Sequence, residues 1–353
     1  MKARRVLMIG PSPDAQGGMA TWAKSAQMAG LFERLEVDYF ASHVDAGKLK
    51  KLIQAAKAYA YVLYLVICEK TLVVHFHVAT GISWWRKWGM IRLLQAFSVP
   101  YVLHLHGGTF KEFYTRHQRR LTGRELVRAF EKADAVLALS PDWVEWVGSI
   151  APRARCISVP NAVVIPPSPT ASSSFKRCLY LGRISKPKGL EELLIAAQCV
   201  LKSHPDFVLE LGGVGDEDWA RELISRLGIE SSVHLLGWLA GQEKESALAR
   251  CDMLVLPSHK EALPFVILEA MARAKLVIAS DVGSIRWVLS DGEAGLLVPA
   301  RATDELASAL TWAMDHAEQA FRLAEAGYMR AQSEFSFDHM EAQLEAIYEN
   351  HVA

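Results

Sequence analysis

Residues 160–174 read PNAVVIPPSPTASSS and separate two halves of the chain that follow one pattern. Four prolines stiffen this stretch and four serines loosen it, which is typical of a linker between domains. On both sides of it, short apolar runs rich in β-branched residues alternate with longer segments of helical spacing. Such alternation predicts parallel sheets built from β-α-β units. We therefore expect two α/β domains, 1–160 and 176–336, joined by a linker over 161–175.

Each half contains short runs that are typical of buried strands. The expected strands cover 6–9, 37–40, 72–76, 101–105 and 135–139 in the first half, and 178–181, 207–211, 233–236, 253–256 and 276–279 in the second. Because ligands of such sheets bind at the carboxyl ends of the strands, we expect functional residues in the loops that follow. The tail, about 337–353, has apolar residues at helical spacing. It predicts a helix that either closes the second domain or packs back on the first.

The charges of the chain are unevenly distributed. Its 353 residues carry 39 Lys and Arg and 39 Asp and Glu, so the formal net charge is zero, which argues against a nucleic-acid binder. Residues 1–160, however, hold 22 basic and 12 acidic side chains. A basic half predicts an anionic partner, such as a membrane surface, a lipid phosphate or a phosphorylated acceptor.

Cysteine use and hydropathy predict a cytoplasmic protein. The five cysteines are scattered and never at CxxC spacing, so they indicate neither a disulfide framework nor a zinc site. The most apolar stretch, 52–67, is interrupted by Lys57 and falls short of the ~20 residues of a spanning helix. Residues 84–88 (WWRKW), with lysines nearby in sequence, favour peripheral contact with an anionic membrane. The alternative is a set of core tryptophans with solvated cations.

The sharpest motif is EALPFVILE at 261–269, which follows the strand expected at 253–256. Pro264 fits the first turn of a helix, because no backbone donor is lost there, and we expect this helix to reach about Lys275. Its N-terminus would offer free N–H groups to a phosphate. Glu261 and Glu269 would be repelled by that phosphate, so each is expected to bind hydroxyls, one set on a sugar and one on a ribose. The alternative is a capped surface helix with two solvated glutamates.

A second motif, GRISKPKG at 182–189, follows the first expected strand of the second half. Arg183 offers a planar fork for phosphate oxygens, and Lys188 offers a point charge. Together they could neutralise a diphosphate leaving group without a metal ion. The alternative is a solvated basic loop.

These two motifs, in this order, resemble those of the retaining glycosyltransferases of family four. The likeness extends to four short pieces that are common when taken singly: Gly17-Gly18, HLHGG at 104–108, Pro160-Asn161 and Gly213-Val214-Gly215. The resemblance implies the GT-B fold, in which two Rossmann-like domains face each other across a cleft.

The same resemblance implies the residues of an active site. Arg183 and Lys188 would bind the donor diphosphate, Glu261 would hold hydroxyls of the donor sugar, and His106 would point at the sugar that is transferred. Such enzymes generally need no metal and retain the anomeric configuration. The rest of the donor-binding set combines glycines that allow close approach, backbone N–H groups for the distal phosphate and a ribose-binding carboxylate: Gly17, Gly18, Gly215, Phe265, Val266 and Glu269.

Histidines alternate on two of the expected strands. His75 and His77 share one face of their strand, and so do His104 and His106. A metal site is conceivable, but histidines satisfied by hydrogen bonds are the preferred interpretation. We therefore expect no metal and no cofactor other than the nucleotide sugar as co-substrate.

The motifs and the resemblance together imply a metal-independent, α-retaining hexosyltransferase. A UDP- or GDP-linked sugar would bind mainly to 175–335, and a glycan acceptor, lipid-linked and used in bacterial surface-polysaccharide assembly, mainly to 1–160. Because no residue has the setting of a covalent nucleophile, a front-face mechanism is favoured. The alternatives are a nucleotide-sugar epimerase of the same fold, a non-catalytic nucleotide-sugar or glycan-binding protein, and an NAD-dependent dehydrogenase. The last is disfavoured because Gly213-Val214-Gly215 lacks the third glycine of the dinucleotide fingerprint.

Overall fold

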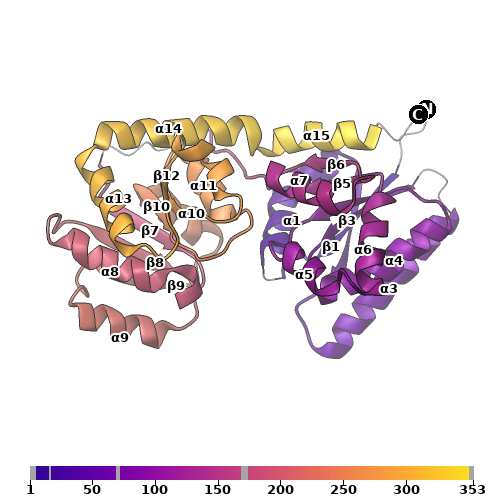
Figure 1. Ribbon diagram of the computed structural model, residues 1–353, viewed down its shortest axis with the longest axis horizontal. Helices are drawn as coiled ribbons and strands as arrows, with labels where there is room; N and C mark the ends of the chain where they lie inside the picture. The colour runs from indigo at the N-terminus through magenta and orange to yellow at the C-terminus, as the bar shows by residue number, and fades with distance from the viewer. Residues whose placement is uncertain (1–4, 16, 69–71, 168–173, 350–353) are drawn as a thin grey trace. The chain divides into compact units, whose positions relative to one another are not determined.

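The structure, a computed structural model, describes residues 5–15, 17–68, 72–167 and 174–349. These residues form two compact units, coloured from indigo to yellow along the chain in Figure 1. The first unit comprises the described residues up to Ala162 together with those from Phe337 onward, and the second unit runs from Val163 to Ser336. Each unit contains one parallel sheet, so the expected pair of Rossmann-like α/β domains is confirmed.

The sheet of the first unit has six described strands in the order β2-β1-β3-β4-β5-β6. The strands are β1 (Arg5–Pro11), β2 (Val37–His43), β3 (Leu72–Val78), β4 (Tyr101–Leu105), β5 (Ala135–Ala138) and β6 (Cys156–Ser158). The helices are α1 (Gly18–Met28), α2 (Leu31–Arg34), α3 (Lys48–Cys68), α4 (Ile82–Ala96), α5 (Phe110–His117), α6 (Leu121–Glu131), α7 (Pro141–Ile150) and α15 (Phe337–Glu349).

Strand β3 shows how the sheet separates an apolar face from a histidine-bearing one. Its sequence LVVHFHV places alternate side chains on opposite faces. Val74 and Phe76 belong to the main core of this unit, together with buried side chains of α3, α4 and α6. On the other face lie His75 and His77, and Trp22 of α1 packs on the His77 ring with 4.1 Å between centroids.

The C-terminal helix α15 belongs to the first unit. Its apolar residues Phe337, Met340, Leu344, Ile347 and Tyr348 are buried. The Tyr348 hydroxyl lies 2.6 Å from Nδ1 of His75, and Glu341 accepts a hydrogen bond from Nε of Arg34 at 2.6 Å. Of the two placements that the sequence left open for the tail, the chain adopts the return to the first unit.

The sheet of the second unit has six described strands in the order β12-β11-β10-β7-β8-β9. The strands are β7 (Arg177–Leu181), β8 (Val208–Gly212), β9 (Val233–Gly237), β10 (Met253–Leu256), β11 (Leu276–Ser280) and β12 (Leu296–Val298). The helices are α8 (Leu190–Leu201), α9 (Glu217–Leu227), α10 (Gly241–Arg250), α11 (Phe265–Met271), α12 (Ile285–Val288), α13 (Thr303–Asp315) and α14 (Ala317–Glu334), with short 3-10 turns η1 (Lys186–Lys188) and η2 (Ser290–Gly292).

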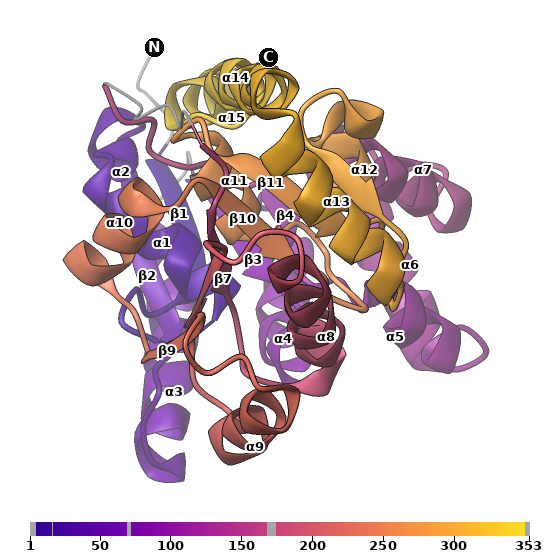
Figure 2. The ribbon, with the colours of Figure 1, turned by 90° about the vertical axis from the view of Figure 1, so that its left-hand side faces the viewer.

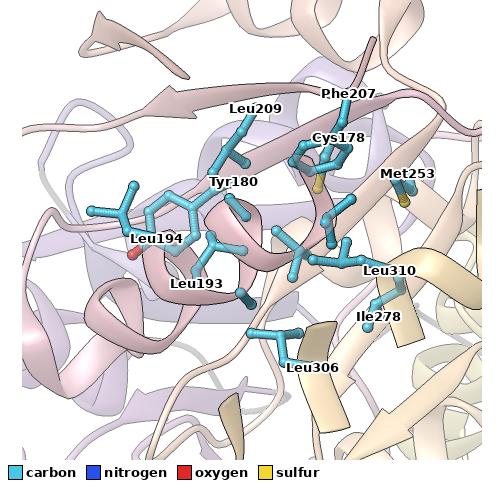
Figure 3. Close-up of a cluster of buried hydrophobic side chains, with 14 of the residues drawn as sticks. Cys178, Tyr180, Leu193, Leu194, Phe207, Leu209, Met253, Ile278, Leu306 and Leu310 are labelled. Carbon is cyan, nitrogen blue, oxygen red and sulfur yellow. The ribbon is translucent and has the colours of Figure 1, made fainter. Parts of the chain in front are cut away.

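The core of the second unit lies between this sheet and α8 and α13. Figure 3 shows Leu193 and Leu194 of α8 and Leu310 of α13 packed with Cys178 and Tyr180 of β7. All five side chains are fully buried. Apolar residues at i, i+3 and i+4 of α8 produce this contact, because they form one stripe on the helix. The core fixes β7, and thus the loop that follows it.

Three features of the fold differ from the expectations. The edge strands β6 and β12 have three residues each, too few for a recognisable apolar run. Helix α11 ends at Met271 rather than near Lys275, because Ala274 adopts a left-handed φ of 53° and turns the chain into β11. The units divide between Ala162 and Val163, and Val163 already pairs with Ser336.

Candidate active site

The candidate donor site lies in the loops that follow β7, β8 and β10 in the second unit. Glycines let these loops pack closely. Gly189 has a φ of +72°, and a Cβ there would lie 1.9 Å from the Pro257 carbonyl oxygen. Gly215 has a φ of +155°, and a Cβ there would lie 2.3 Å from the Ile184 carbonyl oxygen. Gly215, which was predicted to bind the donor, therefore already has a structural function in holding the β8 loop against the β7 loop.

Lys188, predicted to bind the donor diphosphate, is in contact with Glu261, predicted to hold the donor sugar. Nζ of Lys188, at the end of η1, lies 2.5 Å from Oε1 of Glu261 in the loop after β10. The Glu261 side chain is 12% exposed and that of Lys188 is 32% exposed. The motifs at 182–189 and 261–269 are therefore brought together, and Glu261 is not the solvated glutamate of the alternative interpretation. Burial raises the pKa of the Tyr180 hydroxyl, and the negative charge of Glu261 adds to this effect.

Glu269, in α11, has a basic partner that the sequence did not reveal. Nζ of Lys244, in α10, lies 2.6 Å from its Oε1. The Glu269 side chain is 15% exposed, and its Oε2 is buried without a hydrogen-bond partner among the described residues. One carboxylate oxygen is thus held and the other is left to accept. Lys244 carries no motif, because its contact depends on how α10 packs against α11.

The remaining predicted groups of this unit lie at the same edge of the sheet. The Arg183 side chain is exposed, while its carbonyl oxygen accepts a hydrogen bond of 2.7 Å from the Tyr180 hydroxyl. Phe265 and Val266 are the first residues of α11, after Pro264 at the N-cap, so their N–H groups have no partner within the helix by position. A solvent-exposed cation and two backbone donors thus accompany the paired carboxylates.

His106 and the two N-terminal glycines lie in the first unit. His106 follows β4 directly, and its Nε2 lies 2.7 Å from Nδ1 of His77. Burial lowers the pKa of His106, and a hydrogen bond with the Asn161 side chain opposes this effect. Gly17 has a φ of +112° and precedes α1, a Cβ at this position would meet nothing within 4 Å, and Gly18 is the first residue of α1. Open space beside this backbone is compatible with the predicted close approach of a ligand.

The aromatic and basic stretch 84–88 does not form the expected membrane edge. Trp84 is fully buried and makes edge contacts with Phe110 and Phe130, at centroid distances of 6.3 and 6.0 Å. Lys87 is 1% exposed, its Nζ donates to Oγ of Ser83 at 3.2 Å, and burial lowers its pKa to about 7. The prediction was wrong for these two residues. The apolar and basic residues of α4 are spread around the whole helix, so its sequence does not show which side faces solvent.

The long helix α3, whose ribbon is seen in Figure 2, instead carries an exposed apolar stripe. Among the described helices, α3 is the one that is long and apolar enough to cross a membrane by length and composition, and most of it is not buried. Its large exposed apolar residues form one group near each end of the helix, and helical geometry places both groups on the same side: Leu49, Leu52 and Ile53, then Leu63, Tyr64 and Ile67. Lys48, Lys50 and Lys57 are exposed on the same helix.

The two parallel sheets and their arrangement of helices are those of GT-B glycosyltransferases. The structure is similar to sucrose-phosphate synthase from Thermosynechococcus elongatus, with a TM-score of 0.77 and 20% identity over 99% of both chains. It is also similar to HepE from Anabaena in complex with UDP, with a TM-score of 0.75 and 19% identity over 98% of this chain and 100% of that one. These likenesses define the fold.

Sequence comparison assigns the second unit to one family of glycosyltransferases. Residues 165–330 match the family described as "Glycosyl transferases group 1", so the second unit is a domain of that family. The chain is 30% identical over 270 residues to a phosphatidyl-myo-inositol mannosyltransferase of Mycolicibacterium smegmatis, and the matched region covers 72% of this chain and 66% of that protein. It is 31% identical over 172 residues to an α-D-kanosaminyltransferase of Streptomyces kanamyceticus, which covers 48% and 44%. Each match spans less than two thirds of the relative's own length.

Proposed function

We propose that the protein is a retaining glycosyltransferase that moves a hexosyl group from a nucleotide sugar to an acceptor hydroxyl. The observation that carries this proposal is the pair of largely buried carboxylates in a group 1 domain, Glu261 held by Lys188 and Glu269 held by Lys244. The first pair lies in loops that follow parallel strands, where ligands of such sheets bind, and the second pair lies in the helices that begin after β9 and β10. The first unit would supply the acceptor site.

The basic residues account for departure of the leaving group. In the proposed reaction the bond between the anomeric carbon and the diphosphate oxygen breaks, and the acceptor oxygen bonds to that carbon from the same face. The departing phosphate oxygen takes the acceptor proton. Lys188, which now contacts Glu261, would also contact the diphosphate, and the exposed Arg183 side chain would move to bind the diphosphate as well. Both cations would then stabilise the negative charge that develops on the leaving group. No metal ion is needed in this scheme.

Glu261 and Glu269 would divide the recognition of the donor. Glu269 would accept from the ribose hydroxyls, because its Oε2 lacks a partner among the described residues. Glu261 would face the hexose, with His106 of the first unit expected at the same sugar. A uridine or guanosine diphosphate sugar is the proposed donor, and the structures of HepE with UDP and with UDP-glucose support the uridine form.

We further propose that the acceptor is a lipid-linked glycan at the cytoplasmic face of a membrane, as in surface-polysaccharide assembly. The exposed apolar stripe of α3 and its lysines support peripheral contact with an anionic bilayer. Each basic residue near such a surface contributes about 1 kcal/mol. The relative that acts as a phosphatidyl-myo-inositol mannosyltransferase supports a lipid acceptor.

The test is a donor panel on the full chain. UDP-, GDP- and ADP-sugars are screened for protection against thermal unfolding, and release of the nucleoside diphosphate is then followed with and without lipid-linked glycans. We expect one nucleotide class to protect, and release to depend on the acceptor. Donor turnover to an epimer without an acceptor would indicate the epimerase instead, and protection without any turnover would indicate a binding protein.

A further inference from the structure

Three buried histidines form a compact cluster in the first unit. His75 and His77 lie on one face of β3, and His104 lies on β4, where it is the register partner of His77. Each of the three is at most 1% exposed. The His75 and His77 rings are stacked 4.8 Å apart, and the His77 and His104 centroids are 5.2 Å apart. One ring nitrogen from each residue lies within 4.8 Å of those of the other two.

Each imidazole uses one ring nitrogen in a hydrogen bond and leaves the other without a partner. Nδ1 of His75 lies 2.6 Å from the Tyr348 hydroxyl, and Nδ1 of His77 lies 2.7 Å from Nε2 of His106. Nε2 of His104 donates to the Val159 carbonyl oxygen at 3.3 Å. The opposite nitrogens are buried and have no hydrogen-bond partner among the described residues. The expectation that hydrogen bonds satisfy these histidines is therefore only half met.

The hydrogen-bond partners indicate where each ring carries its proton, and they are compatible with an unshared lone pair on each of the three unpartnered nitrogens. A carbonyl oxygen can only accept, so the proton of neutral His104 lies on Nε2 and its Nδ1 carries a lone pair. If His75 and His77 donate from Nδ1 to Tyr348 and His106, their Nε2 atoms carry lone pairs as well. Burial lowers the pKa of all three, to about 4 for His104, so the rings are neutral at physiological pH. Leaving three such acceptors unmatched in a core is costly.

We propose that His75, His77 and His104 bind a single Zn²⁺ ion that joins β3 to β4. Neutral imidazole is a preferred zinc ligand, and three histidines leave one tetrahedral position for water. Zinc–nitrogen bonds of about 2.0–2.1 Å place tetrahedral ligand atoms about 3.3 Å apart, so the rings must close by roughly 1 Å or more. Tyr348, His106 and the Val159 carbonyl would orient the ligands from outside, as such groups do in zinc sites. The site would tie α15 to the sheet through Tyr348.

The test measures metal content and stability of the full chain. The protein is stripped with a chelator, returned to ZnCl₂ or CoCl₂ at pH 8, where Lys87 is largely neutral, and assayed by elemental analysis, thermal unfolding and visible absorption. We expect about one ion per chain, a higher unfolding temperature with Zn²⁺ and the absorption of tetrahedral Co²⁺. His104→Ala should lose all three signals. His117→Ala, in α5 of the same unit, is the matched control and should keep them.

A second variant keeps the test decisive if His104→Ala does not fold. Tyr348→Phe removes only the hydroxyl that contacts His75 and should weaken Zn²⁺ binding by about ten- to a hundredfold. The proposal is overturned if the stripped wild-type chain takes up no zinc, if His104→Ala retains as much as His117→Ala, or if Tyr348→Phe binds as tightly as the wild type. None of these readouts measures donor binding or turnover, so failure of the zinc proposal can be told apart from failure of the proposed transferase activity.

Discussion

Replacing Glu269 by glutamine should weaken the binding of free nucleoside diphosphate by about ten- to a hundredfold. The carboxylate presents one oxygen to Lys244 and a second, buried oxygen without a partner among the described residues. In glutamine one of these two oxygens is replaced by an NH₂ group, so a single acceptor remains for both Lys244 and the ribose. Hydrogen bonds to a charged partner contribute about 1.5–3 kcal/mol, and about 1.4 kcal/mol corresponds to a factor of ten in affinity.

Glu261→Gln should have the opposite profile. The free diphosphate product carries no hexose, so its affinity should stay the same or rise slightly, because Lys188 is released from its 2.5 Å ion pair to bind phosphate. The loss should appear in turnover. Positive charge develops on the sugar ring as its bond to phosphate breaks, and a nearby anion stabilises that charge.

The assay is calorimetric titration of both variants with UDP and GDP, beside steady-state rates. Glu245→Gln is the matched control, since Glu245 is an exposed carboxylate of α10 that pairs with Arg273. Melting curves of all three variants establish that each is folded at the titration temperature. If Glu261→Gln loses nucleotide affinity and Glu269→Gln does not, the two roles are reversed. If neither variant differs from Glu245→Gln, the paired carboxylates do not bind the donor.

Four further outcomes are expected. UDP affinity should be equal in EDTA and in Mg²⁺, because the loop after β7 supplies the positive charge; a requirement for Mg²⁺ or Mn²⁺ would contradict this. Leu52→Glu with Ile67→Glu on α3 should reduce binding to anionic vesicles and leave UDP affinity unchanged; loss of both would make the stripe a packing surface. Gly189→Ala should lower the unfolding free energy by about 1–3 kcal/mol, whereas Gly148→Ala, with open space and no positive φ, should not; equal melting temperatures would refute the close packing. Lys87→Met should raise the melting temperature at pH 6 more than at pH 10. Burial depresses the folded pKa to about 7, so the wild type itself gains stability as pH rises from about 7 toward 10; parallel melting profiles would show that the amine is solvated.

The short apolar runs and the segments of helical spacing between them were sufficient to predict both sheets and most of their strands. Strands such as β5 and β10 are continuous apolar runs that are buried on both faces, and this is the strongest signal that a parallel sheet gives. Lys188 and Glu261 were each predicted to lie in a loop after a strand, but their contact was not predicted, because it depends on β7 and β10 being neighbours in the folded sheet.

Other features depend on packing that no local pattern records. Lys244 reaches Glu269 because α10 and α11 come directly before and after β10 in the fold. The two residues are 25 positions apart in the sequence, and no periodic pattern connects them. The burial of Trp84 and Lys87 depends on which side of α4 meets the sheet, and the sequence of α4 does not favour one side. The histidine cluster needed the register of β3 with β4, which only the folded sheet provides.

The return of α15 to the first unit makes the second unit an insert within the first. Its two ends are adjacent, because Val163 pairs with Ser336 and the Val163 N–H donates to the Phe335 carbonyl oxygen at 2.8 Å. Residues 163–336 can therefore be excised as one continuous cassette, and a short connection from Ala162 to Phe337 would close the gap that remains. A fragment that stops at residue 162 would instead lack the buried face of α15 and the hydroxyl that contacts His75. The half that we propose to bind the donor is thus the exchangeable module, and grafting a related cassette between Ala162 and Phe337 is the rational way to alter it while leaving the proposed acceptor half unchanged.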